Sequence, residues 1–179
     1  DSGTYYVLAT DGAGTYDVVV MDMDANVVQE IDANISYGTS IAYHVDDYFL
    51  VGDGSNIFRV TWEGDVEPFN TSPMPSVVYR VSVSDDGTTT VAEEYDVTEL
   101  DEDGDIVNHT QTSQYCWMDT SVGDSPNGGN TAVLDIFGPT IATWDADSGS
   151  FETVATNIGS NSNILGQDDL TTAGRAWRL

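Results

Sequence analysis

Short apolar stretches alternate with clusters of Gly, Asp and Asn along the whole chain of 179 residues. The stretches are short and of the β type, and none shows a helical period with capping residues over ten residues. This pattern predicts an antiparallel all-β fold. Strands are expected at 5–10, 17–23, 27–31, 41–45, 48–51, 57–62, 77–83, 88–95, 97–100, 106–110, 114–118, 132–137, 141–144, 151–155 and 175–179.

The breaks between these stretches carry the residues of tight hairpin turns. Asp-Gly pairs and similar sequences favour the positive φ angles that two-residue turns require. The clearest examples are Asp11-Gly12, Asp53-Gly54, Asp86-Gly87, Asp103-Gly104 and Ser148-Gly149. The sequence therefore predicts that neighbouring strands are joined as hairpins.

A longer repeat is built from these hairpins. Four units of strand, acidic turn and strand are centred near Asp24, Gly64, Asp103 and Asp147, about 40 residues apart. A further strand precedes each unit, and a four-stranded unit at this interval resembles a blade of a β-propeller. We expect one domain over 1–179 with repeats at 1–38, 39–75, 76–113 and 114–160, forming a four-repeat propeller or a propeller fragment. A β-sandwich or jelly roll of hairpins is the alternative.

The first repeat lacks a candidate for its innermost strand. The stretch 163–166 could supply this strand from the other end of the chain. We therefore expect 161–179 to act as a closing segment. Within it, 175–179 is expected to pair as a strand, either against the first repeat or in a neighbouring subunit.

The charge of the chain indicates its environment. Asp and Glu total 31 against four Lys and Arg, all four of which are Arg, and the net charge is −27. The Debye length is about 10 Å at 0.1 M salt and about 3 Å at 1 M, so concentrated salt removes the repulsion between neighbouring carboxylates. This composition resembles that of acidic extracellular or virion proteins of extreme halophiles. The resemblance implies an extracellular, cell-surface or virion location.

The same charge excludes some partners. Nucleic acids and anionic membrane surfaces attract basic surfaces, which four Arg side chains cannot provide. The chain also lacks an apolar run long enough for a transmembrane helix. The expected partners are other protein subunits, in a homo-oligomer or a hetero-oligomer.

The strongest candidate for a metal site is one acidic turn. Asp101, Asp103 and Asp105 have the alternating carboxylates that suit Ca²⁺, a hard cation with oxygen ligands. The turn does not continue as an EF-hand, because Thr112 stands where that loop needs a bidentate Glu. An ordinary hairpin turn in an Asp-rich chain is the alternative interpretation. No other cofactor is expected.

Catalytic constellations are sparse in this sequence. The two histidines, His44 and His109, have neither a second His nor a Cys at metal-ligand spacing, and no His follows Ser125 in its Gly-Asp-Ser sequence. A pair of carboxylates would suit a glycosidase, but among 31 acidic residues such pairs are expected by chance and do not indicate this activity. Aromatic residues could stack on sugars if several shared one face, although most are expected in the core: Tyr43, Tyr48, Tyr79, Tyr115, Trp117, Trp144 and Trp177.

These observations favour a protein without catalytic activity. The expected function is a structural or protein-interaction module displayed on a halophilic cell surface or virion. The alternatives are a sugar- or ligand-binding propeller and one lobe of a larger propeller enzyme, both of which rest on fold analogy.

Overall fold

The computed structural model describes residues 4–10, 12, 14–84, 86–111, 120–121, 131–135 and 140–155. The strands of these residues form four antiparallel sheets, which follow one another along the chain. The first sheet contains β1 (Tyr5–Thr10), β2 (Tyr16–Met21) and β3 (Val27–Ile35). The second contains β4 (Gly38–His44), β5 (Tyr48–Asp53), β6 (Asn56–Val60) and β7 (Val66–Pro68).

The remaining two sheets also have four strands each. The third contains β8 (Val78–Val83), β9 (Thr89–Glu93), β10 (Asp96–Leu100) and β11 (Ile106–Gln111). The fourth contains β12 (Thr120–Ser121), β13 (Thr131–Asp135), β14 (Thr140–Asp145) and β15 (Ser150–Ala155). None of the described residues belongs to a helix that is long and apolar enough to cross a membrane.

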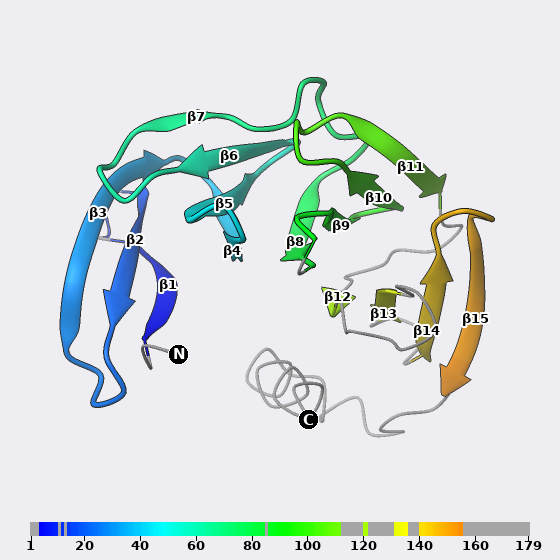
Figure 1. Cartoon of the computed structure of the whole chain (residues 1–179), viewed down its shortest axis with the longest axis horizontal. Coiled ribbons are helices and arrows are strands. Elements are labelled where there is room, and N and C mark those ends of the chain that lie inside the picture. Colours follow the sequence, from blue (N-terminus) through cyan, green and yellow to red (C-terminus); the bar gives the residue numbers. More distant parts are fainter. Residues whose placement is uncertain are drawn as a thin grey trace.

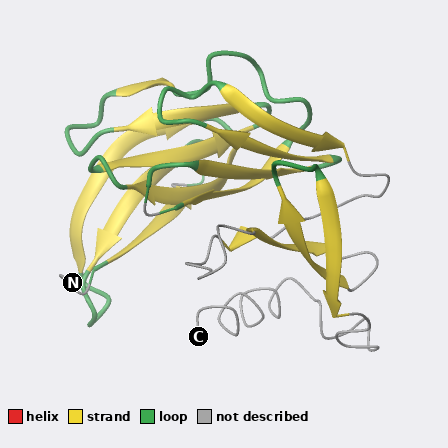
Figure 2. Cartoon of the chain, turned by 45° about the vertical axis from the view of Figure 1, so that its right-hand side comes forward, coloured by secondary structure: helices red, strands yellow, loops and turns green. Residues whose placement is uncertain are grey.

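The four sheets stand side by side in an arc, like successive blades around an axis (Figure 1). In each sheet the first strand lies on the concave side and the last strand on the convex side, and Figure 2 shows the same succession from another direction. This arrangement is propeller-like and confirms the predicted fold class. Each sheet is called a blade below. The sandwich alternative is set aside, because successive sheets follow an arc rather than forming two layers.

The four acidic turns predicted from the sequence join the two outer strands of each blade. Each hairpin contains a residue with positive φ: Ala25, Gly64, Gly104 or Gly149. Glycine adopts this conformation without a steric penalty, which explains why three of the four positions carry it. The hairpins pair their strands in antiparallel register.

The core lies between neighbouring blades rather than within one layer. The run Tyr48–Val51 in β5 illustrates this, because its side chains alternate between two clusters: Tyr48 and Leu50 pack towards the third blade, whereas Phe49 and Val51 pack towards the first. All four side chains are buried. Full burial of one such side chain contributes roughly 1.5–3 kcal/mol. A strand of a middle blade is therefore apolar on both faces.

The first blade differs from the second and the third. It has three described strands, and β1 pairs only with β2 among the described residues. The hairpin at Asp24 shows that β1 corresponds in position to β5 and β9. The residues that we expected to supply its innermost strand, 163–166, lie outside the described residues, as does the whole closing segment 161–179.

Candidate functional site

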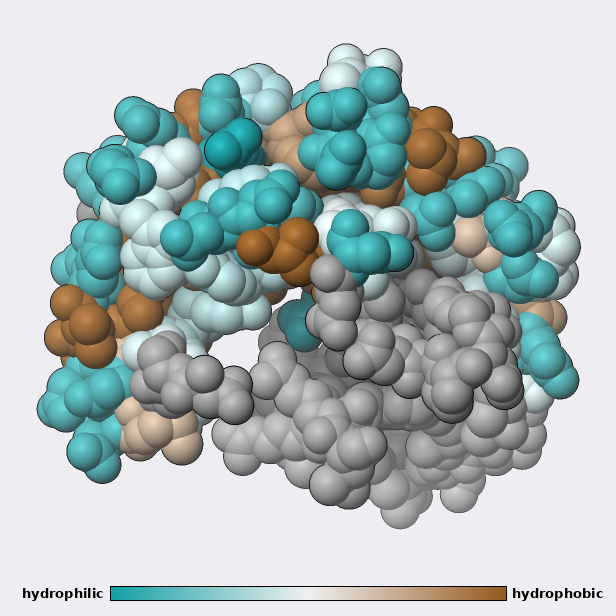
Figure 3. All heavy atoms as spheres, viewed as in Figure 1, coloured by the Kyte–Doolittle hydropathy of each residue, from teal (hydrophilic) through white to brown (hydrophobic). Residues whose placement is uncertain are grey.

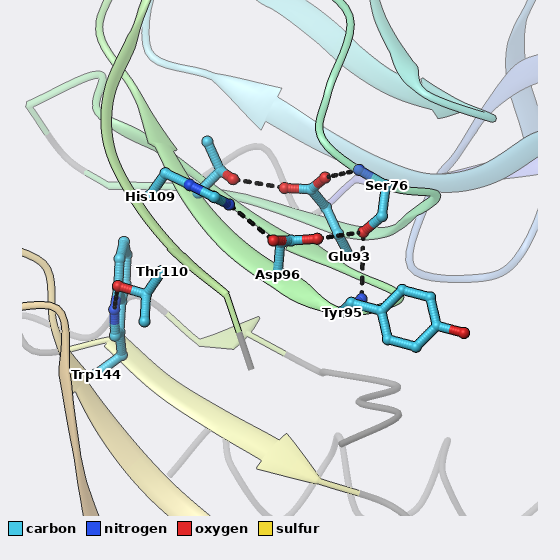
Figure 4. A network of polar contacts seen from close by, with 8 residues as sticks. Ser76, Glu93, Tyr95, Asp96, His109, Thr110 and Trp144 are labelled. Atoms are coloured by element: carbon cyan, nitrogen blue, oxygen red, sulfur yellow. Dashed lines mark hydrogen bonds and ion pairs between the residues drawn. The ribbon is translucent and has the colours of Figure 1, made fainter. Parts of the chain in front are cut away.

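Two carboxylates are buried at the β9–β10 hairpin. Glu93 ends β9 and Asp96 begins β10, and both belong to the interior of the third blade. The connection from β7 to β8 crosses this hairpin at Ser76, as Figure 4 shows. The Ser76 amide donates a hydrogen bond to Glu93 Oε2 (2.7 Å), and its hydroxyl donates to Asp96 Oδ2 (2.8 Å). One serine therefore holds both buried carboxylates.

The remaining oxygens of the two carboxylates also have partners. The Thr98 hydroxyl donates to Glu93 Oε1 (2.5 Å), and His109 Nε2 lies 2.7 Å from Asp96 Oδ1. Burial raises the pKa of Glu93 to about 7, against the hydrogen bonds from Thr98 and Ser76, which lower it. The side chain of His109 is 38% exposed while that of Asp96 is 4% exposed, so the imidazole is the solvent-facing end of this network.

The order of these contacts argues against nucleophilic catalysis. A serine nucleophile needs its hydroxyl proton to be taken by the base, so the imidazole must lie between serine and carboxylate. Here Asp96 lies between Ser76 and His109, and the hydroxyl donates to the carboxylate. The network instead ties the β7–β8 connection to β9, β10 and β11. Buried polar groups that are fully satisfied in this way specify one packing arrangement.

Sequence reasoning missed this network. His109 was assigned no partner, yet the fold brings it to Asp96, because the two residues lie diagonally on the paired strands β10 and β11, where His109 is opposite Thr98 and Asp96 is opposite Gln111. The available signal was Glu93, a carboxylate within the expected strand 88–95. A buried carboxylate needs partners, but its partners cannot be identified without the hairpin register.

The other histidine also has a structural environment. His44 is fully buried and stacks on Tyr48, with ring centroids 4.3 Å apart. Its Nε2 lies 3.2 Å from the carbonyl oxygen of Gly87 in the third blade. Arg59 covers Tyr48, with Cζ 4.3 Å from the ring centroid. This group, His44, Tyr48 and Arg59, is called the closed aromatic cluster.

A second aromatic cluster lies between the first and second blades. Tyr6 of β1, Tyr43 of β4 and Trp62 of the β6–β7 turn surround Phe49, with ring centroids 4.9–5.5 Å from that of Phe49. Tyr6 and Tyr43 are each 37% exposed, whereas Phe49 is fully buried. Tyr6, Tyr43, Trp62 and the adjoining Asp47 are called the aromatic rim.

The other aromatic residues singled out from the sequence have different positions. Trp144 is buried, and its Nε1 donates a hydrogen bond to Thr110 Oγ1 (3.0 Å), which ties the fourth blade to the third (Figure 4). Tyr79 is partly buried on β8. Tyr115, Trp117 and Trp177 lie outside the described residues, as does Ser125.

The candidate calcium ligands lie in the β10–β11 hairpin. Asp101 Oδ1 accepts the amides of Asp103 (3.1 Å) and Asp105 (2.9 Å), so this carboxylate already closes the turn. Asp105 accepts a hydrogen bond from the hydroxyl of Thr71 in the preceding blade. No group of three or more His, Cys, Asp or Glu among the described residues is arranged to hold a metal ion. Calcium at Asp101, Asp103 and Asp105 stays a prediction.

The same hairpin makes a close contact between blades. A Cβ atom at Gly104 would lie 2.0 Å from the carbonyl oxygen of Phe69, and the Thr71 amide donates to the Gly104 carbonyl (3.1 Å). The position also has φ +81°. Both the backbone conformation and the approach of the second blade therefore require glycine.

Comparison with known proteins identifies the fold and no more. No protein-family model matches the chain, and no curated protein matches its sequence. The WD40 β-propeller domain of Doa1 superposes with a TM-score of 0.65 at 17% identity, over 87% of this chain and 51% of that one. Virginiamycin B lyase from Staphylococcus aureus gives 0.63 at 14% identity, over 88% and 53%.

A gluconolactonase from Xanthomonas campestris is also similar, with a TM-score of 0.56 at 17% identity over 71% of this chain and 44% of that one. The chain thus spans about half the length of the solved structures that it matches. Some of these structures are enzymes and one is a WD40 domain, so the shared fold does not select an activity.

Proposed function

We propose that the chain is a non-enzymatic interaction module of a halophilic cell surface or virion, and that its first blade binds another protein subunit. The observation that supports this function is the exposure of β1. The corresponding strands β5 and β9 are buried along almost their whole length. In β1, by contrast, Tyr5, Tyr6 and Val7 are 46%, 37% and 37% exposed.

An exposed apolar strand at a sheet edge is a template for pairing with another chain. Soluble proteins cover such edges or use them in assembly. On the face seen in Figure 3, the described surface is mainly hydrophilic, with separate apolar spots. Other exposed apolar side chains, such as Met23, Val27 and Val28, lie at the β2–β3 hairpin rather than on an inner strand. The buried network at Glu93 and Asp96 adds support, because its geometry serves packing rather than a reaction.

A cross-linking experiment tests the interaction. A photoactivatable benzoylphenylalanine replaces Tyr5 in one variant and Tyr37 in a matched control, where Tyr37 is 62% exposed in the β3–β4 turn. Irradiation in the native salt should join position 5 to one discrete protein subunit and leave position 37 unlinked. Equal or diffuse cross-linking at both positions would overturn the proposal.

The halophilic part of the proposal rests on the net charge of −27. Thermal melts between 0.1 and 3 M NaCl should show a midpoint that rises with salt, because screening removes the repulsion among carboxylates. A flat or falling midpoint contradicts a halophilic environment.

A second candidate function is one lobe of a larger propeller, with ligand-binding or enzymatic activity. It is favoured by the half-length coverage of the matched structures. In that case the exposed side chains of β1 contact further blades of the same polypeptide. The cross-link at position 5 would then be intramolecular, and peptide mapping of the linked species separates the two outcomes.

A further inference from the structure

The aromatic rim has a rigid base. Phe49 is fully buried in β5, and its ring packs against those of Tyr6, Tyr43 and Trp62. Tyr6 and Tyr43 also contact each other, with centroids 6.0 Å apart and planes inclined at 35°. Two partly exposed tyrosine rings are therefore held in fixed relative positions on one buried phenylalanine.

Asp47 fixes the polar side of the rim. Its Oδ1 accepts hydrogen bonds from Trp62 Nε1 (2.9 Å) and from the hydroxyl of Tyr43. The bond from Tyr43, and then that from Trp62, lowers the pKa of Asp47, while the bond to Asp47 raises the pKa of Tyr43. A charged carboxylate thus adjoins neutral aromatic rings. Asp47 also has φ +70°, a conformation that asparagine tolerates as well.

On the opposite face of the second blade, a tyrosine ring already binds a guanidinium group. Arg59 covers Tyr48 there at 4.3 Å, and its Nε lies 3.8 Å from Glu67. A guanidinium thus meets a tyrosine face and a carboxylate together. The aromatic rim offers the same two elements, but no cation–π contact among the described residues involves Tyr6, Tyr43 or Trp62.

The charge around the rim favours a cation. Asp46 is exposed beside Asp47, and Glu63 is exposed beside Trp62. We propose that the aromatic rim binds an arginine side chain of the partner subunit, with the guanidinium against Tyr6 and Tyr43 and near the carboxylate of Asp47. This inference rests on the proposed interaction function and names the group that is recognised.

Cation–π contact suits a partner in concentrated salt. Screening weakens the attraction between exposed charges beyond a few ångströms, whereas a guanidinium in contact with a ring keeps its short-range attraction and its apolar contact. Arginine also forms planar hydrogen bonds with carboxylates, which fits a rim that combines rings with Asp47.

The test uses the whole chain and two tripeptides that differ in one charge. Acetyl-Gly-Arg-Gly-amide is titrated into the protein in about 2 M NaCl, where long-range attraction to its negative surface is screened. The indole N–H signal of Trp62 is followed by NMR and assigned with Trp62→Phe. The arginine peptide should shift this signal saturably. The peptide with citrulline in place of arginine keeps the shape without the charge and should not.

Matched variants identify the residues. Tyr43→Leu and Tyr6→Leu should each weaken binding about two- to fivefold, as expected for loss of one exposed cation–π contact. Tyr37→Leu should leave it unchanged. Asp47→Asn should weaken binding, whereas Asp24→Asn, which removes one charge from a distant hairpin, should not. Thermal melts of each variant exclude unfolding as the cause, and Tyr43→Phe, which keeps the ring, should retain most of the binding.

The outcomes separate this inference from the proposed function. Equal shifts of the Trp62 signal with the arginine and citrulline peptides overturn the arginine site. Maltotriose tests sugar binding instead, and a shift with maltotriose but none with the arginine peptide also overturns it. If the rim fails to bind arginine while position 5 still cross-links to a discrete subunit, the interaction function stands and the rim has no part in recognising arginine. If position 5 does not cross-link but the arginine peptide binds, the site stands without the proposed partner.

Discussion

The two faces of the second blade carry aromatic clusters that differ in one respect. On the face towards the third blade, Tyr48 is 4% exposed, stacks on His44 and is covered by Arg59. On the face towards the first blade, Tyr43 is 37% exposed and is bonded to Asp47. In the closed cluster, the Tyr48 ring is enclosed by residues of its own chain, whereas the aromatic rim presents tyrosine rings and a carboxylate to solvent.

The closed aromatic cluster is therefore expected to contribute to stability, and the aromatic rim to binding. Burial raises the pKa of Tyr48 to about 12, so this phenol remains neutral within the packed interior. The third blade continues this pattern, since Glu93 and Asp96 find all their partners inside the fold. Substitutions on the closed side should therefore alter folding, and substitutions on the open side should alter binding.

The largest expected effect lies in the closed region and depends on pH. The pKa of Glu93 is about 7 in the folded chain against an ordinary value of 4.5. A carboxyl group with a raised pKa stabilises the fold while it is protonated. The contribution is complete below pH 4.5 and is lost as pH rises to about 7, and it amounts to about 3 kcal/mol.

Glu93→Gln isolates this contribution. Glutamine is uncharged and can still accept from the Ser76 amide while it donates to Thr98. Urea unfolding at pH 5 and pH 7.5 in high salt covers most of this range, and should show a stability loss in the wild type that is about 2 kcal/mol larger than in the variant. The neighbouring Asp96 and His109 are present in both proteins. Equal losses would mean that Glu93 does not change its protonation in this range.

A smaller effect is expected where Arg59 covers Tyr48. Arg59→Met keeps most of the apolar stem and removes the cation, so the free energy of unfolding should fall by about 1 kcal/mol. Glu67→Gln breaks only the exposed ion pair and should change it by less than about 0.5 kcal/mol. Equal losses from the two variants, measured by urea unfolding, would assign the effect to the ion pair instead.

The smallest effect on stability is expected at the aromatic rim. Asparagine tolerates the positive φ of position 47 as aspartate does. Asp47→Asn should therefore change the free energy of unfolding by less than about 0.5 kcal/mol. The pKa of Tyr43 should fall towards its ordinary value, because its hydrogen bond to Asp47 is the main cause of the rise. A pH titration of ¹³C-labelled tyrosine followed by NMR measures this change. An unchanged pKa would show that Asp47 does not bond to this phenol in solution.

The sequence predicted the architecture well because hairpin chemistry is local. The acidic turns near Asp24, Gly64, Asp103 and Asp147 each join two strands, as expected. The strand β7 (Val66–Pro68) was expected only from the repeat and was given no range of its own, because Pro interrupts the apolar pattern. Proline is tolerated on the edge strand of a sheet, and β7 is the outermost described strand of the second blade.

The sites depended on contacts that no local pattern encodes. Tyr6 and Tyr43 come from adjacent repeats, and the repeat alone does not say which of their side chains meet. Ser76 reaches Glu93 and Asp96 only because the β7–β8 connection crosses the β9–β10 hairpin. The run Tyr48–Val51 predicted a buried strand but not that its faces belong to different clusters.

The inner edge of β1 has no partner strand among the described residues, and amide hydrogen exchange measures directly whether that edge is accessible to solvent. Exchange of the isolated chain in high salt should be at least about 100-fold faster at this edge of β1 than in β5, a difference of roughly 3 kcal/mol in opening free energy. Within β1, fast and slow amides should alternate, because every second amide faces β2. Uniform protection of β1 equal to that of β5 would show that its edge is covered, and a partner subunit could then not pair with it.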